Sequence, residues 1–416
     1  MKYLFFYLFH RINLFIIKLN LEKMPKEYSN DILLNFELLQ LSYIFTDITV
    51  GTPSKTIKAY IQFKYYQYFI VDKLNLNFYS KDLSTSFIPN PKYEIDFKDS
   101  LFSKGYYCTE TFIFKNITNE DLKIEKVATI IAIETNLDYP CYLGFNFYKD
   151  ESLDIHENFI YELKKSKQID FDIFFFEFFN DIKGEIKIGD LPHKYNSSIY
   201  NEKNLKWNYI YLDKIKKWNI FFTQIFFGNK IFKGSTICYL EYELNMIHAP
   251  NEYKQLFIET FIEDNKNKCD EFINKNNHSF FICDINVNYK NFPIIIFNSK
   301  EFNFKFELNY KDLFFEINGK LYFLVDFNNN SKNFYGWRLG FPFLKKYKFL
   351  FNFSKKSIGF YNNKDNKKFF SFFLIFILLI VIIICLLIII YNIKYTKRKK
   401  RVNEIEVNYD YFNKII

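Results

Sequence analysis

The sequence predicts an all-β fold followed by one membrane-spanning helix. Segments such as 44–50 and 183–190 alternate apolar and polar residues and end at glycine-containing turns, a pattern typical of β-strands. The apolar run 369–393 is instead long enough to cross a bilayer as a helix. With 416 residues, the chain can form two lobes of ordinary domain size before that helix.

Composition and charge exclude two classes of protein. Hydrophobic residues make up 49% and aromatic residues 22% of the chain, which is too much apolar surface for a disordered protein. The net charge of +9 gathers at the two ends, because residues 1–30 contribute +3 and residues 394–416 contribute +4, leaving +2 for the rest. No basic face for nucleic acid is therefore expected.

Short motifs for metals and nucleotides are absent from the sequence. There is no CxxC pair, no HExxH and no glycine-rich phosphate loop. His193 and His248 have no second ligand at metal-binding spacing, so we interpret both as polar surface or turn residues. We expect neither a metal nor a cofactor.

The two ends of the chain predict its topology. Apolar runs within 3–17 follow Met1-Lys2 and predict a signal peptide over 1–18, although His10 and Arg11 interrupt them; an uncleaved anchor is the alternative. The run 369–393, about 25 residues or roughly 37 Å as a helix, exceeds the bilayer core of about 30 Å. Basic residues begin at Lys394, which predicts a cytoplasmic tail over 394–416 and a lumenal or extracellular large domain. We expect a single-pass membrane protein of the secretory pathway or cell surface.

The stretch 51–72, GTPSKTIKAYIQFKYYQYFIVD, reads as a turn and the second strand of a β-hairpin. It resembles the opening hairpin of the pepsin-like aspartic peptidases, whose second strand ends in the catalytic Asp-Thr-Gly. On that register the catalytic Asp corresponds to Gln62, and the Thr and Gly correspond to Phe63 and Lys64.

Three later segments carry the same resemblance. In CYLEYELNMIHAP, 238–250, the second catalytic Asp corresponds to Glu241, followed by Tyr242 and Glu243. The segment 92–114 resembles the flap hairpin, with Phe97 at the place of the flap Tyr. The segment 337–361, WRLGFPFLKKYKFLFNFSKKSIGFY, resembles the family's closing Trp-Ile-Leu-Gly-Asp…Ile-Gly-Phe.

The resemblance implies a bilobal pepsin-like acid protease fold, with an N-terminal lobe over 41–204, a C-terminal lobe over 205–362 and a cleft between them. The family's mechanism needs two carboxylates that share one proton. Gln62 cannot ionise, and the extra methylene of Glu241 displaces its carboxylate. We therefore expect no catalytic residues, and we interpret Glu241 and Lys64 as surface or inter-lobe charges.

Three hypotheses of function follow. The first is a membrane-anchored, non-catalytic pepsin-family protein, a pseudoprotease, that binds a peptide or protein partner in the inter-lobe cleft. The alternative is an active aspartic-type endopeptidase whose catalytic residues lie on another register. The third is a surface or trafficking protein in which only an outer face matters. The missing residues at both loops favour a non-enzymatic function.

The six cysteines allow several pairings. A loop pair in this part of the second lobe is common in the family, so the resemblance implies a disulfide between Cys269 and Cys283. A second bridge between Cys108 and Cys141 stays open. Cys238 is expected to be free and buried.

Overall fold

The computed structural model describes residues 15–22, 31–40, 43–63, 68–72, 78–96, 102–114, 122–135, 140–146, 158–180, 183–211, 217–274, 277–328, 336–362 and 377–398. As expected, this part of the chain is mostly β, with one apolar helix near the C-terminus. The chain divides into two compact units, Met1–Tyr361 and Asn362–Ile416.

The first sheet has thirteen strands in the order β11-β26-β25-β9-β10-β1-β2-β3-β8-β4-β7-β6-β5. Their bounds are β1 Phe15–Glu22, β2 Tyr43–Val50, β3 Lys55–Gln62, β4 Phe69–Val71, β5 Ile88–Asp96, β6 Phe102–Phe114, β7 Leu122–Thr135, β8 Cys141–Gly144, β9 Ile173–Phe178, β10 Lys183–Ile188, β11 Leu205–Tyr209, β25 Phe349–Asn352 and β26 Ser357–Tyr361. The sheet therefore joins strands from both ends of the first unit.

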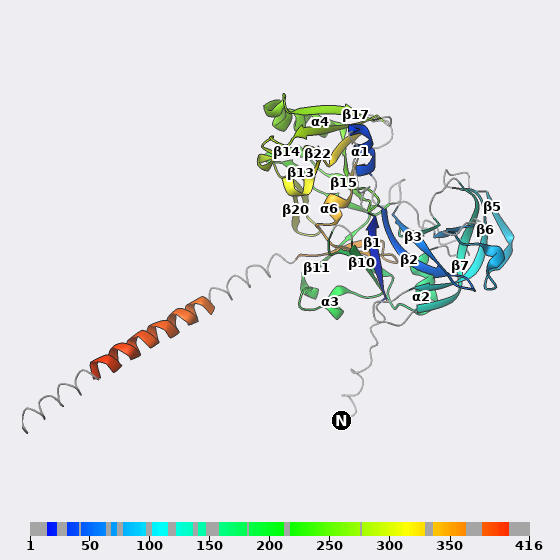
Figure 1. Cartoon of the computed structure of the whole chain (residues 1–416), viewed down its shortest axis with the longest axis horizontal. Helices are drawn as coiled ribbons and strands as arrows, with labels where there is room; N and C mark the ends of the chain where they lie inside the picture. Colours follow the sequence, from blue (N-terminus) through cyan, green and yellow to red (C-terminus); the bar gives the residue numbers. More distant parts are fainter. Residues whose placement is uncertain are drawn as a thin grey trace, which may run out of the picture. The chain divides into compact units, whose positions relative to one another are not determined.

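The predicted opening hairpin is confirmed. β2 and β3 pair in antiparallel fashion from Phe45↔Tyr60 to Val50↔Lys55, and they lie side by side in Figure 1. The turn begins at Gly51, whose φ of +82° lies in the left-handed region that only glycine adopts without steric cost. The hairpin expected at 92–114 also forms, as antiparallel β5 and β6. Its tip, including Phe97, lies outside the described residues.

The expected signal peptide, 1–18, overlaps β1. Phe15, Ile17 and Leu19 are buried, and β1 pairs with both β10 and β2. The reason is the alternation of apolar and polar residues from Ile17 to Asn20, which suits a strand with one buried face. Residues 15–18 thus belong to the first unit, whereas residues 1–14 lie outside the described part of the chain.

A second sheet has nine strands, eight of them in the order β12-β15-β24-β16-β23-β18-β22-β21, with β17 paired to β18; a third is ordered β14-β13-β19-β20. Their bounds are β12 Asn219–Phe222, β13 Gln224–Phe227, β14 Lys230–Lys233, β15 Thr236–Leu240, β16 Ile247–Pro250, β17 Cys269–Ile273, β18 His278–Asp284, β19 Ile295–Ser299, β20 Phe304–Leu308, β21 Phe314–Ile317, β22 Lys320–Phe323, β23 Val325–Asn328 and β24 Trp337–Leu339.

The described helices of the first unit are short. They are α1 Ile32–Gln40, α2 Phe159–Lys165, α3 Pro192–Tyr195, α4 Asn251–Phe257, which continues as a π-helix over Ile258–Ile262, α5 Tyr310–Leu313 and α6 Phe341–Leu344. At the start of α2, the Asn158 side chain accepts hydrogen bonds from the first-turn amides of Ile160 and Tyr161.

Helix α1 packs far from its neighbours in sequence. Phe36 and Leu39 form one apolar cluster with Phe280 and Tyr322 of the second sheet and with Met246, which directly precedes β16. Figure 1 draws α1 in blue beside the green and yellow strands near β17. The early part of the chain therefore covers a face of the second sheet.

The second unit contains one helix, Ile377–Arg398, that is long and apolar enough to cross a membrane. Its 22 residues span about 33 Å, against a bilayer core of about 30 Å. The helix extends past the expected limit of 393 and includes Lys394 and Arg398, because lysine and arginine are good helix formers. Residues 369–376 and 399–416 lie outside the described part of the chain.

The predicted disulfide between Cys269 and Cys283 is confirmed, and these residues are register partners on β17 and β18. The open possibility of a bridge between Cys108 and Cys141 is not realised. Both are free, buried cysteines, on β6 and β8, and the Cys108 thiol donates a hydrogen bond to the carbonyl of Thr129. Cys238 is free and buried, as expected.

Candidate functional site

Two segments that carry the predicted site residues meet in the first unit. Gln62 ends β3 and pairs with Gly144 of the parallel strand β8, while its carbonyl accepts a hydrogen bond of 2.7 Å from the amide of Phe145. The other segment, 241–243, follows directly after β15. Gln62 is a neutral amide at the end of a paired strand, so this position supplies no ionisable group. Lys64 lies outside the described residues.

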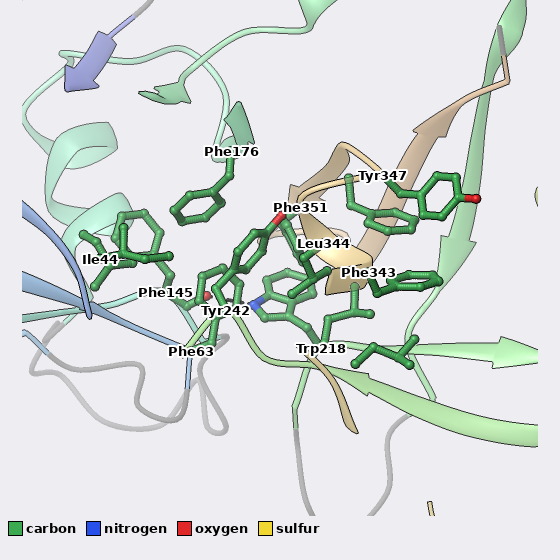
Figure 2. Packing of buried hydrophobic residues seen from close by; sticks show 14 of the residues in the cluster. Ile44, Phe63, Phe145, Phe176, Trp218, Tyr242, Phe343, Leu344, Tyr347 and Phe351 are labelled. Atoms are coloured by element: carbon green, nitrogen blue, oxygen red, sulfur yellow. Dashed lines mark hydrogen bonds between the residues drawn. The ribbon is translucent and has the colours of Figure 1, made fainter. Parts of the chain in front are cut away.

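Aromatic rings join the two segments. The ring centroids of Phe63 and Tyr242 are 4.7 Å apart, and both side chains are fully buried. Further rings from β9, from β25 and from the residue after β8 surround Phe63, as Figure 2 shows in part: Phe174, Phe176, Phe351 and Phe145. Such ring pairs each add about 0.5–1.5 kcal/mol beyond area burial. The junction is therefore an apolar core rather than a polar loop contact.

Glu241 lies at the edge of this core with no exposed surface. Its Oε1 accepts a hydrogen bond of 2.7 Å from Lys217 Nζ, and its Oε2 is paired with the guanidinium of Arg338. Burial alone would raise the pKa of Glu241, but Arg338 and Lys217 outweigh it and hold the pKa well below its usual range. The interpretation of Glu241 as a surface charge is therefore wrong, because this carboxylate is fully buried and paired with Lys217 and Arg338.

Glu243 also connects the segment 241–243 to the end of β3. Its Oε2 accepts a hydrogen bond of 3.3 Å from the backbone amide of Phe63. Burial, and then the neighbouring carboxylate of Glu241, raise the pKa of Glu243 above its usual range. The loop therefore contains two carboxyl groups whose pKa values shift in opposite directions.

The backbone around Gly340 holds the 241–246 loop in place. A Cβ at this position would lie 2.1 Å from the carbonyl oxygen of Met246 and 2.4 Å from that of Leu244, so a larger residue would displace the loop. The next amide, of Phe341, donates a hydrogen bond of 2.6 Å to Leu244. The glycine of the Trp-Arg-Leu-Gly motif therefore lets the backbone at Gly340 lie close to the loop that follows Glu241.

A second polar cluster lies on the second, nine-stranded sheet. His248 on β16 is the register partner of Asp326 on the parallel strand β23, and their side chains are hydrogen-bonded. His278, at the start of β18, lies 3.1 Å from the other oxygen of Asp326 through its Nδ1. Burial alone would raise the pKa of Asp326, but His248 and then His278 outweigh it and lower the pKa to about 2.

This cluster corrects the interpretation of His248 as an isolated polar residue. His248 is buried in a strand, and two further potential metal ligands lie beside it. His193, the other histidine considered, has its Nδ1 2.8 Å from the hydroxyl of Tyr361. Sequence spacing could not reveal the cluster, because strand pairing brings together residues 48 and 78 positions apart.

The end of α1 reaches both polar groups. The carbonyl of Gln40 accepts a hydrogen bond of 3.1 Å from the amide of Asn245, in the loop that follows Glu241. The Gln40 side chain donates one of 3.1 Å to Asp326. Nothing in the sequence had singled out Gln40, Lys217 or Arg338 as partners of the site. Comparison with models of known protein families and with curated proteins finds no match to this chain.

Proposed function

We propose that the chain is a membrane-anchored, pepsin-like protein of two lobes that lacks peptidase activity and binds a peptide or protein partner between the lobes. The ordered resemblance of residues 41–361 to that family supports the fold. The mostly β architecture, the β2–β3 and β5–β6 hairpins and the Cys269–Cys283 disulfide are consistent with it.

One observation carries the absence of catalysis. An aspartic peptidase needs two carboxylates that share a proton and contact a water molecule. Both oxygens of Glu241 are instead paired with cations, its side chain has no exposed surface, and Gln62 cannot ionise. Activation of water at this pair of positions therefore has no base.

The resemblance also implies the chemical class of the partner. A cleft of this family receives an extended peptide, and loss of the carboxylate pair removes hydrolysis without requiring loss of recognition. The apolar junction of Phe63 and Tyr242 keeps the two segments together without a catalytic pair. We therefore infer that the ligand is a peptide segment of a partner that is bound and not cleaved.

The full-length protein in detergent tests this proposal. It should not cleave an unfolded protein at acid pH, and a statine-type transition-state mimic should not raise its melting temperature, because the mimic's hydroxyl needs the shared proton. Peptides eluted from the purified protein should raise the melting temperature, and the increase should grow with the logarithm of their concentration. Acid cleavage that the statine mimic blocks would contradict the proposal.

An active endopeptidase is the second candidate, and one observation favours it. Glu241 and Glu243 are two neighbouring carboxyl groups whose pKa values move apart, as those of acid–base pairs do. Under this alternative, Glu243→Gln should abolish acid cleavage while Glu252→Gln, an exposed control on α4, retains it. Under the proposal, the wild type, Glu243→Gln and Glu252→Gln are equally inactive.

The orientation of the membrane anchor is part of the proposal. Basic residues at the end of the helix, Lys394, Lys397 and Arg398, support a cytoplasmic C-terminus and a lumenal or extracellular large domain. Protease added outside sealed microsomes should then remove only the tail. Protection of the tail with loss of the large domain would reverse the orientation.

A further inference from the structure

Three neighbouring strands place two imidazoles and one carboxylate on one face of the second sheet. His248 and Asp326 face each other across the parallel pair β16–β23. On the antiparallel pair β18–β23, His278 is opposite Asn328, two residues from Asp326 and therefore on the same face. The potential ligand atoms of the three side chains all lie within 4.8 Å of one another.

We propose that His248, His278 and Asp326 bind a divalent transition metal ion of the zinc type. Two imidazole nitrogens and one carboxylate oxygen form a donor set that suits zinc, at about 2.0–2.2 Å from the metal. Ligands of a tetrahedral ion lie roughly 3.4 Å apart at those bond lengths. Both Nδ1 atoms already point at the Asp326 carboxylate, so small side-chain rotations bring the three groups to that spacing.

Charge favours a cation at this place. Asp326 has no exposed surface, and a buried carboxylate is costly unless a positive charge or several hydrogen bonds compensate it. Arg338, the register partner of His248 on β24, has its guanidinium on Glu241. A metal ion bound to both Nδ1 atoms and to Asp326 would supply that positive charge, with each neutral ring carrying its proton on Nε2.

Gln40 can complete the coordination. Its side-chain amide contacts Asp326 at 3.1 Å, and rotation of the amide by half a turn would present an oxygen to the same place. Four protein ligands make a closed, structural site. The metal would then fasten the end of α1 to β16, β18 and β23. This inference stands whether or not the chain binds a peptide.

Metal titration of the full-length protein in detergent tests the proposal. After chelation and dialysis, Co²⁺ should bind with a stoichiometry of one and give the visible absorption of a tetrahedral site, and Zn²⁺ should displace it. Zn²⁺ should also raise the melting temperature. Asp326→Asn and His278→Gln should each weaken binding by more than about 100-fold, beyond the roughly 10- to 100-fold that loss of an outer partner costs.

Matched variants decide the outcome. His193→Gln removes a histidine outside the cluster and should bind Co²⁺ as the wild type does. Gln40→Ala should weaken binding less than the loss of either ligand. If Asp326→Asn does not fold, His278→Gln still gives the answer, since its side chain is partly exposed. No stoichiometric binding by the wild type, or wild-type affinity in His278→Gln, would overturn the proposal and leave a hydrogen-bonded His–Asp–His group.

Discussion

Two fully buried carboxylates, one directly after a strand of the second sheet and one on a strand of it, differ in their partners. Glu241, after β15, is paired with Lys217 and Arg338, whose charged ends only donate hydrogen bonds. Asp326, on β23, is paired with His248 and His278, whose ring nitrogens are also common metal ligands. Equal burial therefore leads to a structural ion group in one place and to a potential ligand site in the other.

The comparison shows that partner chemistry, more than burial, decides what a buried carboxylate can do. Both groups have pKa values held low against the effect of burial. Lysine and arginine offer only donors, so the Glu241 group is complete as it stands. Imidazole nitrogens can bind a metal, so the Asp326 group can exchange partners.

The largest effect is expected from removing one cation of the Glu241 group. Arg338→Met leaves a buried carboxylate with a single counter-charge and should lower the free energy of unfolding by about 3–5 kcal/mol. The double variant Glu241→Gln/Arg338→Met should recover part of that loss. Urea unfolding measures both. Lys123→Met, which removes an exposed ion pair, should leave the urea midpoint unchanged, and an equally small shift for Arg338→Met would contradict the comparison.

The Cys269–Cys283 disulfide stabilises the surroundings of Asp326, because it joins β17 to the strand that carries His278. Replacing Cys269 and Cys283 by serine should lower the free energy of unfolding by about 2–4 kcal/mol. Metal affinity at Asp326 should fall as well, since the β17–β18 hairpin loosens. Non-reduced peptide mapping should show the linked peptides in the wild type, and alkylated thiols at both positions would refute the bridge.

A smaller effect is expected at Glu243, with a defined dependence on pH. Its pKa is raised in the folded state, so the unfolded chain loses this proton first as the pH rises. The stability that this group contributes is present below the unfolded pKa and is lost as the pH rises through the folded pKa.

Glu243→Gln has no such proton and keeps an oxygen for the amide of Phe63. Relative to the wild type, its free energy of unfolding should therefore rise from about pH 4.5 upward, by an amount on the order of 1 kcal/mol. Thermal or urea unfolding across pH measures this difference. An equal rise for Glu252→Gln, the exposed control, or a flat line for Glu243→Gln would contradict this prediction.

The smallest effect, none at all, is expected from placing aspartate at the two positions where the resemblance puts catalytic residues. Gln62→Asp with Glu241→Asp should not produce acid cleavage of an unfolded protein. Lys217 and Arg338 would still pair with the second carboxylate, and the rings of Phe63 and Tyr242 would still exclude water. Cleavage by this double variant would show that the two positions need only their carboxylates.

Local patterns in the sequence determined a good part of the architecture. The Gly51 turn predicted the β2–β3 hairpin, and the apolar run predicted the helix Ile377–Arg398. These signals work because turn chemistry and apolar length act on neighbouring residues. The alternation in β1 carried the same kind of signal, but its nearness to the N-terminus suggested a signal peptide instead.

Only the tertiary structure decided the partners of the charged groups. Glu241 takes Lys217 and Arg338 from 24 and 97 positions away, and strand pairing brings His248 and His278 to Asp326. Such pairs depend on strand order and register across the sheet, which no local pattern encodes. The sequence by itself determined that Gln62 cannot ionise, while the fold decided that Glu241 is held between two cations and that Asp326 faces two imidazoles.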